Sequence, residues 1–197
     1  MKNTLLTLAI IVLFAGFTTK HGIDNCFVSF DTASNHKMTS PDRLPGSSEK
    51  TRMVITNQGE VKVSRIDGYR ILYNNDKKAP FVNLKVELSD KKSYKSDKKN
   101  LLEHLSYLNA NSEGMETKEL IEVEVNGYKV YGLNRVSIDS GSILGTFIMF
   151  PGNGVTVYFY FNNLKPEYRH FDNLKEYKQL RDAFLKEYTS HLVSCMK

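Results

Sequence analysis

Residues 142–161 read SILGTFIMFPGNGVTVYFYF. Two runs rich in β-branched and aromatic residues flank residues 151–154, Pro-Gly-Asn-Gly, which favour a tight turn. In the second run, residues 155–161, valine and phenylalanine alternate with threonine and tyrosine, so the two sets point to opposite sides of a strand. The stretch predicts an antiparallel hairpin whose valine and phenylalanine side belongs to the core.

The tyrosine side of this strand has two open interpretations. If it is uncovered, Tyr158 and Tyr160 form an amphipathic aromatic surface for a protein or a sugar, because tyrosine combines a large contact area with a polar tip. If a helix covers it, the two tyrosines form a second core layer, and this is the interpretation that we favour. Both tyrosines are therefore candidate binding residues.

The combination of β-rich runs and turn residues recurs along the chain. Asn57-Gln58-Gly59 joins two short runs, and Asn126-Gly127 and Asp139-Ser140-Gly141 join longer ones. Successive hairpins of this kind predict an antiparallel sheet. In residues 81–88 apolar and polar residues alternate, which predicts one buried face and one wet face. The expected strands are 52–56, 61–65, 69–73, 81–88, 119–125, 128–138, 142–150 and 155–161.

Two segments have the helical period instead. From Ser96 to about Asn109, four leucines fall on one side of a helix, with Ser96 as the expected N-cap and Asp97 in the first turn. From Asn173 to Val193, apolar residues again recur at helical spacing. Runs of strands with helices on their faces predict the α+β class, an antiparallel β-sheet flanked by two main helices.

The first residues have the pattern of a secretory signal. Lys2 precedes an apolar stretch, residues 4–17, which as a helix reaches roughly 21 Å, short of the roughly 30 Å hydrocarbon core of a bilayer. We therefore expect a cleaved signal peptide at 1–22, an irregular arm at 23–50 that is rich in Ser, Thr, Pro and Gly, and a single α+β domain at 51–197. The expected location is secreted or periplasmic.

The chain has two cysteines, Cys26 and Cys195, near the two ends of the expected mature protein. An oxidising compartment would let them pair. We predict a disulfide between them, and the alternative is two free thiols.

The order of these elements resembles the PsbP-like superfamily, which includes PsbP and DcrB. The likeness covers about residues 66–190 and rests on a pattern of strands and helices, with no diagnostic motif. The segments that carry it are 68–73, 81–86, 121–123, 126–132 and a C-terminal amphipathic helix that ends near Phe184.

Membership of this superfamily implies an α/β/α sandwich around an antiparallel sheet, in proteins that mostly bind or support other proteins. The chain departs from the pattern in having no tryptophan and in its arm at 27–50. The resemblance transfers no functional residue, because the superfamily has no shared catalytic set.

The sequence carries no motif for a cofactor, a metal or a nucleophile. The five histidines have no ligand spacing, and no Gly-x-Ser-x-Gly elbow or phosphate-binding glycine loop is present. A net charge of +5 with charges of both signs does not indicate a nucleic-acid partner. We expect no enzyme activity, no catalytic residue, no cofactor, no metal and no nucleic acid.

Lysines gather around the start of the first helix. Lys98 and Lys99 oppose the helix dipole there. This permits binding to an anionic surface such as lipid head groups, although a surface that only keeps the protein in solution is the simpler explanation. The candidate binding residues are Lys91, Lys92, Lys95, Lys98 and Lys99.

These observations favour an exported, non-enzymatic binding or accessory module that contacts a protein partner in the cell envelope. The alternative is a carrier of a small apolar ligand or lipid between helix and sheet, with a hydrolase as the third hypothesis. A pocket lined by Phe81, Leu105 and Phe147 would favour the carrier, and a converging Ser, His and acid would favour the hydrolase.

Overall fold

The computed structural model describes residues 37–38, 42–44, 50–74, 82–163, 171 and 173–192. The cysteines Cys26 and Cys195, and with them the predicted disulfide and signal peptide, lie outside these residues. The elements are β1 (Lys37–Met38), β2 (Asp42–Arg43), β3 (Thr51–Thr56), β4 (Gly59–Ser64), β5 (Asp67–Asn74), β6 (Val82–Leu88), α1 (Tyr94–Ala110), β7 (Met115–Val125), β8 (Tyr128–Ser137), β9 (Ile143–Gly152), β10 (Val155–Asn163) and α2 (Leu174–His191).

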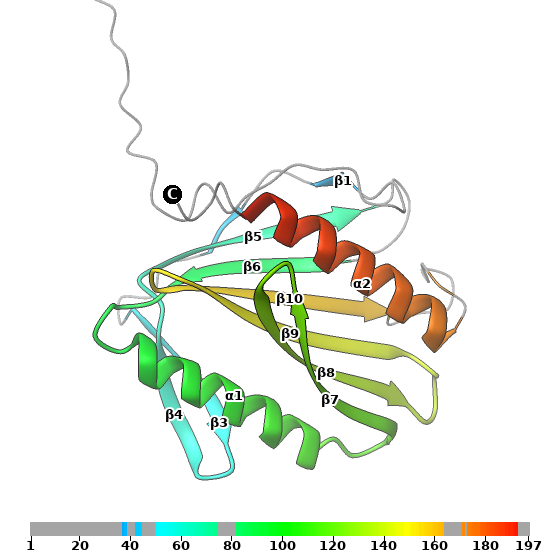
Figure 1. Ribbon diagram of the computed structural model, residues 1–197. Helices are drawn as coiled ribbons and strands as arrows, with labels where there is room; N and C mark the ends of the chain where they lie inside the picture. The colour runs from blue at the N-terminus through cyan, green and yellow to red at the C-terminus, as the bar shows by residue number, and fades with distance from the viewer. Residues whose placement is uncertain are drawn as a thin grey trace, which may run out of the picture.

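An eight-stranded sheet forms the centre of the molecule (Figure 1). Its strand order is β1-β5-β6-β10-β9-β8-β7, with β2 also paired to β5, and every pairing is antiparallel. Strands β1 and β2 come from the segment that the sequence predicts to be an irregular arm. The α+β class with an antiparallel sheet and two helices is confirmed.

Tight turns set the register of the long hairpins. Asn126 and Gly127 between β7 and β8 have φ values of 49° and 80°, and Asn153 and Gly154 between β9 and β10 have φ values of 50° and 83°. Asparagine and glycine tolerate this left-handed backbone better than other residues. The turns predicted from these pairs are therefore where the chain reverses.

Helix α2 covers one face of the sheet. Its buried residues Tyr177, Phe184, Leu185 and Tyr188 pack with the valine and phenylalanine side of β10, as the sequence predicts for that side. The Asn173 side chain caps the helix by accepting a hydrogen bond from the Glu176 backbone N–H at 2.9 Å. This aromatic layer is the larger of the two cores.

Two glycines make room for aromatic rings in this core. Gly132 on β8 lies opposite Phe147 on β9, and a methyl group at Gly132 would overlap the Phe147 ring. A methyl group at Gly145 would overlap the hydroxyl of Tyr177. The rings therefore pack directly onto the sheet backbone.

Helix α1 and the β3–β4 hairpin together cover the opposite face. Leu101 and Leu105 of α1 and Val54 and Val63 of the hairpin share a core with side chains of β8, β9 and β10. The hairpin is a separate two-stranded sheet, and its backbone ladder pairs β3 only with β4 among the described strands. Figure 1 shows it beside α1, away from α2.

A buried carboxylate holds the hairpin to the start of α1. Asp97 is 2% exposed, and its Oδ2 accepts hydrogen bonds from Ser64 Oγ at 2.6 Å and Ser93 Oγ at 2.9 Å. Ser64 ends β4 and Ser93 is the N-cap residue of α1. The helix therefore begins at Tyr94, ahead of the predicted N-cap Ser96, because the contacts of Asp97 and Ser93 order an earlier turn.

The prediction of a wet face on β6 is wrong. Val82, Leu84 and Val86 are buried as expected, but on the other side Glu87 is 3% exposed and Lys85 is half-buried. The hairpin lies over this polar side. No helix among the described residues is long and apolar enough to cross a membrane.

Candidate functional site

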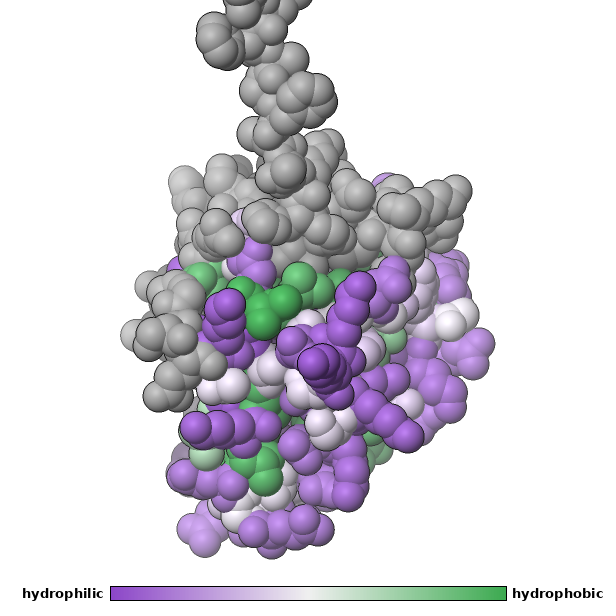
Figure 2. Space-filling model, turned by 90° about the vertical axis from the view of Figure 1, so that its left-hand side faces the viewer, coloured by the Kyte–Doolittle hydropathy of each residue, from purple (hydrophilic) through white to green (hydrophobic). Residues whose placement is uncertain are grey.

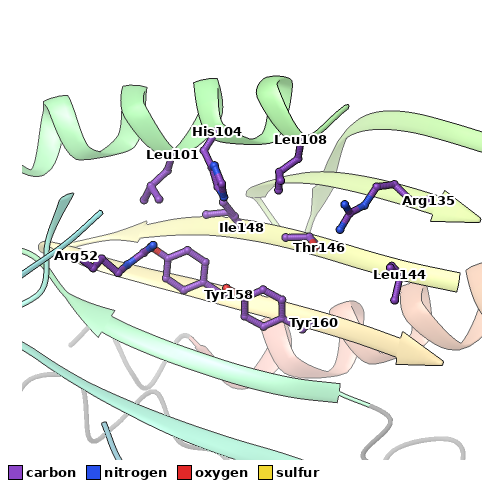
Figure 3. Close-up of a pocket in the computed structure, with 10 residues that line it drawn as sticks. All are labelled: Arg52, Leu101, His104, Leu108, Arg135, Leu144, Thr146, Ile148, Tyr158 and Tyr160. Atoms are coloured by element: carbon purple, nitrogen blue, oxygen red, sulfur yellow. The ribbon is translucent and has the colours of Figure 1, made fainter. Parts of the chain in front are cut away.

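A cavity of about 260 Å³ lies between α1 and the sheet, on the face opposite α2 (Figure 3). Its floor is formed by β9 and β10, its roof by α1, and Arg52 of the hairpin and Arg135 of β8 lie at its two ends in Figure 3. The lining residues are Arg52, Leu101, His104, Leu108, Arg135, Leu144, Thr146, Ile148, Tyr158 and Tyr160.

The two periodicities of strand and helix bring these side chains together. Leu144, Thr146 and Ile148 are alternate residues of β9, so they share one face of that strand. Leu101, His104 and Leu108 are three and four residues apart on α1, so they share one side of that helix. The result is a partly open cavity in which aliphatic side chains and tyrosine rings lie beside the polar groups of Arg52, His104, Arg135 and Thr146.

At one end of the cavity, Arg52 joins three strands through its guanidinium. Its Nε donates to Glu87 Oε2 at 3.0 Å, its Nη2 donates to the hydroxyl of Tyr158, and the group lies 4.9 Å from the Tyr158 ring centroid. Arg65 is a second cation near Glu87, with Nη1 at 4.0 Å from Oε1. The charge of Arg52 is therefore compensated by Glu87.

The floor presents two stacked phenols. The rings of Tyr158 and Tyr160 are 6.3 Å apart with an interplanar angle of 9°, and the ammonium of Lys85 lies 5.0 Å from the Tyr160 ring centroid. Burial raises the pKa of Tyr158 well above 10 and that of Tyr160 to about 12. Both hydroxyls therefore stay protonated at neutral pH and can donate hydrogen bonds.

His104 lines the roof of the cavity. Its Nδ1 lies 2.7 Å from the backbone carbonyl oxygen of Ile55 on β3. Because a carbonyl oxygen only accepts hydrogen bonds, Nδ1 carries a proton and donates it to this contact. The histidine thus ties α1 to the hairpin.

Arg135 lies at the opposite end from Arg52. Its Nη1 donates to Ser112 Oγ at 3.2 Å, and its Nε is buried without a hydrogen-bond partner among the described residues. Burial lowers the pKa of Arg135. At Arg52 burial also lowers the pKa, but the interactions of the guanidinium with Tyr158 and Glu87 outweigh this effect and raise it. Arg135 is the cavity residue whose charge lacks compensation in the described part of the chain.

The predicted site residues fall in two separate places. Tyr158 and Tyr160 lie in the cavity under the cover of α1 and the hairpin. The lysines lie in the β6–α1 turn and the first turns of α1, where Lys99 pairs with Glu103 at 3.6 Å and the ammonium of Lys98 lies 5.2 Å from the Phe150 ring centroid. Lys91, Lys92, Lys95 and Lys99 are exposed, and Lys98 is half-buried.

Figure 2 views the side of the molecule where the β6–α1 turn projects at the left of Figure 1. Hydrophilic residues cover most of its described surface, with small apolar areas among them. The lysines therefore belong to a broadly hydrophilic side, and none of them lines the cavity between α1 and the sheet.

A second hollow, of about 320 Å³, lies on the other side of α1 against β7 and β8. Leu102, Leu105, Leu120 and Tyr131 supply its apolar lining, and Leu120 is 49% exposed. The pocket that the sequence suggests, lined by Leu105 and Phe147 with Phe81, does not form from the described residues, because Leu105 and Phe147 lie on opposite faces of the sheet. Phe81 itself lies outside those residues.

Sequence patterns did not single out Arg52 or Arg135. Both occur in ordinary strand alternation, and only the folded contacts distinguish the compensated guanidinium from the uncompensated one. In the described part of the chain, no three His, Cys, Asp or Glu side chains are grouped so as to hold a metal ion.

Comparison with models of protein families finds no match, and neither does comparison with curated proteins. The PsbP-like resemblance therefore stays a prediction.

Proposed function

We propose that this protein is an exported, non-enzymatic binding protein that holds a small amphipathic molecule in the cavity between α1 and the sheet. The observation that supports this most directly is the lining of the cavity. Leu101 and Leu108 of α1 lie over a floor that carries Leu144, Ile148 and the two tyrosine rings, and an arginine lies at each end. An apolar enclosure with a few convergent polar groups is the usual form of a small-molecule site.

The same lining favours binding over catalysis. Of the described residues that line the cavity, none is Asp, Glu, Ser or Cys, so His104 has no carboxylate, serine or cysteine beside it there. Its Nδ1 is occupied by the Ile55 carbonyl. A hydrolase would need a nucleophile, a base and an orienting acid in one place.

A volume of about 260 Å³ limits the size of the ligand. It is slightly below the usual range for small-molecule sites, roughly 300–1,000 Å³. The proposed ligand is therefore a short-chain or single-ring molecule, and a two-chain phospholipid is too large to be enclosed.

Replacing Leu108 with tryptophan is the test of this proposal, because the larger side chain fills the cavity from the roof. Binding of small amphiphiles, measured by calorimetry on the full exported chain, should be lost in Leu108→Trp. The matched control is Leu102→Trp, which lies on the same helix but lines the other hollow, and it should bind as the wild type does. Equal binding by wild type and Leu108→Trp would overturn the proposal.

Purification from the cells that make the protein tests the occupant directly. Mass spectrometry under native conditions should detect a small molecule bound to the wild type and absent from Leu108→Trp. A stoichiometric protein partner, retained equally by both forms and without a small molecule, would instead favour the accessory-module hypothesis.

A further inference from the structure

The charge balance of the cavity is uneven between its two ends. At one end Glu87 lies 3.0 Å from Arg52 Nε and compensates its charge. At the other end, Arg135 has no ion-pair partner among the described residues, and its Nη1 donates a hydrogen bond to the neutral Ser112. The cavity thus contains one uncompensated guanidinium.

An unpaired donor in this position is costly. Arg135 Nε is buried and makes no hydrogen bond within the described chain. A buried donor that has lost its water and gained no acceptor destabilises the fold, and more so when it belongs to a charged group. A ligand that offers an anionic acceptor at this point would remove that cost.

The surroundings of Arg135 define the rest of the ligand. In Figure 3 its guanidinium points towards Thr146 on the floor, at the end of the cavity where Leu108 and Leu144 also lie. An anionic group seated there would continue directly into the aliphatic and tyrosine-lined part of the enclosure. This arrangement fits a ligand that has a charged group at one end and a short apolar chain or ring at the other.

The number of charges favours a monoanion. A carboxylate carries one negative charge and has two oxygens that match the fork of a guanidinium. A phosphate monoester would bring more than one negative charge to a cavity whose lining has one guanidinium, Arg135, without an ion-pair partner among the described residues. Charge and geometry both favour a carboxylate.

We propose, on the basis of the small-molecule binding proposed above, that the ligand is a monocarboxylate with a short apolar body, whose carboxylate accepts hydrogen bonds from Arg135. Thr146 lies beside this head group on the floor, and the apolar body lies between α1 and the two tyrosine rings. This assigns Arg135 as the residue that selects the ligand's charge.

The test compares octanoate with its neutral counterpart octanamide, using calorimetry on the full exported chain. Wild type should bind octanoate about tenfold to a hundredfold more tightly than octanamide, the difference that a charge-assisted hydrogen-bonded pair gives. In Arg135→Met this preference should disappear. The control is Lys118→Met, because Lys118 is the cross-strand neighbour of Arg135 on β7, is exposed, and does not line the cavity; it should keep the preference.

A second readout separates ligand selection from a structural role. Without ligand, Arg135→Met should be at least as stable to urea as wild type, because it removes a partly buried, unpaired charge. A structural arginine would instead leave the variant less stable.

The failures of the two proposals are distinguishable. Equal binding of octanoate and octanamide by wild type, abolished for both in Leu108→Trp, would overturn the carboxylate inference and leave the binding cavity. Binding of neither compound would overturn both. The wild-type comparison does not depend on whether a variant folds.

Discussion

Under the β3–β4 hairpin, the carboxylate of Glu87 forms ion pairs with two cations, Arg52 and Arg65. Its side chain is 5% exposed and lies 3.0 Å from Arg52 and 4.0 Å from Arg65. Removing one partner of a buried ion pair leaves the other charge uncompensated, and this costs more than the intact pair contributes. The position is therefore sensitive to loss of charge although it contributes little net stability by itself.

Glu87→Gln should lower the free energy of unfolding by about 2–3 kcal/mol, somewhat less than for a fully buried pair because a quarter of the Arg52 side chain remains exposed. Urea denaturation followed by circular dichroism measures the loss. The matched control is Glu60→Gln, an exposed carboxylate on the same hairpin, and it should change stability by less than about 0.5 kcal/mol. A loss as small in Glu87→Gln as in Glu60→Gln would show that the ion pair is not needed.

Arg135 shows what sequence reasoning at single residues leaves out. It stands between Asn134 and Val136 in a predicted strand, and an arginine at such a position is usually a solvated residue. Its significance comes from the absence of a described acidic partner once the chain is folded, and residue type alone does not give that information. The tyrosines of β10 were found because they alternate strictly with the core residues.

At the scale of elements, the β3–β4 hairpin is attached mainly through side chains. Ser64 contacts Asp97, the Ile55 carbonyl accepts from His104, and Arg52 pairs with Glu87. Its backbone ladder pairs β3 only with β4 among the described strands. An element held in this way can open without breaking the main sheet.

Asp97→Ala should therefore loosen the hairpin selectively. Amide hydrogen exchange should become faster in β3, β4 and the first turn of α1, by about tenfold or more, while β9 and β10 keep the exchange rates of wild type. Asp97→Asn, which retains an acceptor oxygen, should show a smaller increase. Equal acceleration in all strands would indicate that the hairpin opens only with the whole molecule.

The positions of strands and turns could be predicted from the sequence, but the position of this hairpin could not. Residues 51–64 show two β-rich runs and a turn, and these are local signals that predict a hairpin. Where the hairpin packs depends on contacts with Glu87 and Asp97, which lie more than twenty residues away along the chain. Because sequence patterns do not show the contact with Glu87, the polar side of β6 is predicted to be solvated although the hairpin covers it.

At the scale of the whole molecule, both cores contain buried tyrosines. Burial raises the pKa of Tyr158, Tyr160 and Tyr177 above the usual value of 10, and that of Tyr160 reaches about 12. Tyr158 and Tyr160 lie on the α1 face and Tyr177 on the α2 face. Ionisation of these phenols therefore opposes the packing of both layers.

Stability should fall as the pH rises above 10. Up to that pH both folded and unfolded chains hold the phenol protons, but above it the unfolded chain releases them first, so the free energy of unfolding decreases with pH. For Tyr160 alone the decrease amounts to about 2–3 kcal/mol once the pH passes 12. Circular dichroism and tyrosinate absorbance followed together should show the three buried phenols ionising only as the fold is lost.

Tyr160→Phe provides the comparison for this pH dependence. It removes one ionising group from the floor of the cavity, so its alkaline unfolding midpoint should lie at higher pH than that of wild type. Ionisation of all eleven tyrosines near pH 10 with the circular dichroism unchanged would contradict the burial argument.

The pairing of Gly132 with Phe147 across β8 and β9 has a consequence for sequence variation. The ring occupies the space that any larger residue at position 132 would need, so position 132 cannot change while Phe147 is present. A substitution of Gly132 becomes tolerable only together with a smaller residue at 147. In a future alignment of relatives, these two positions should covary as one unit, with a glycine wherever the facing strand carries a phenylalanine.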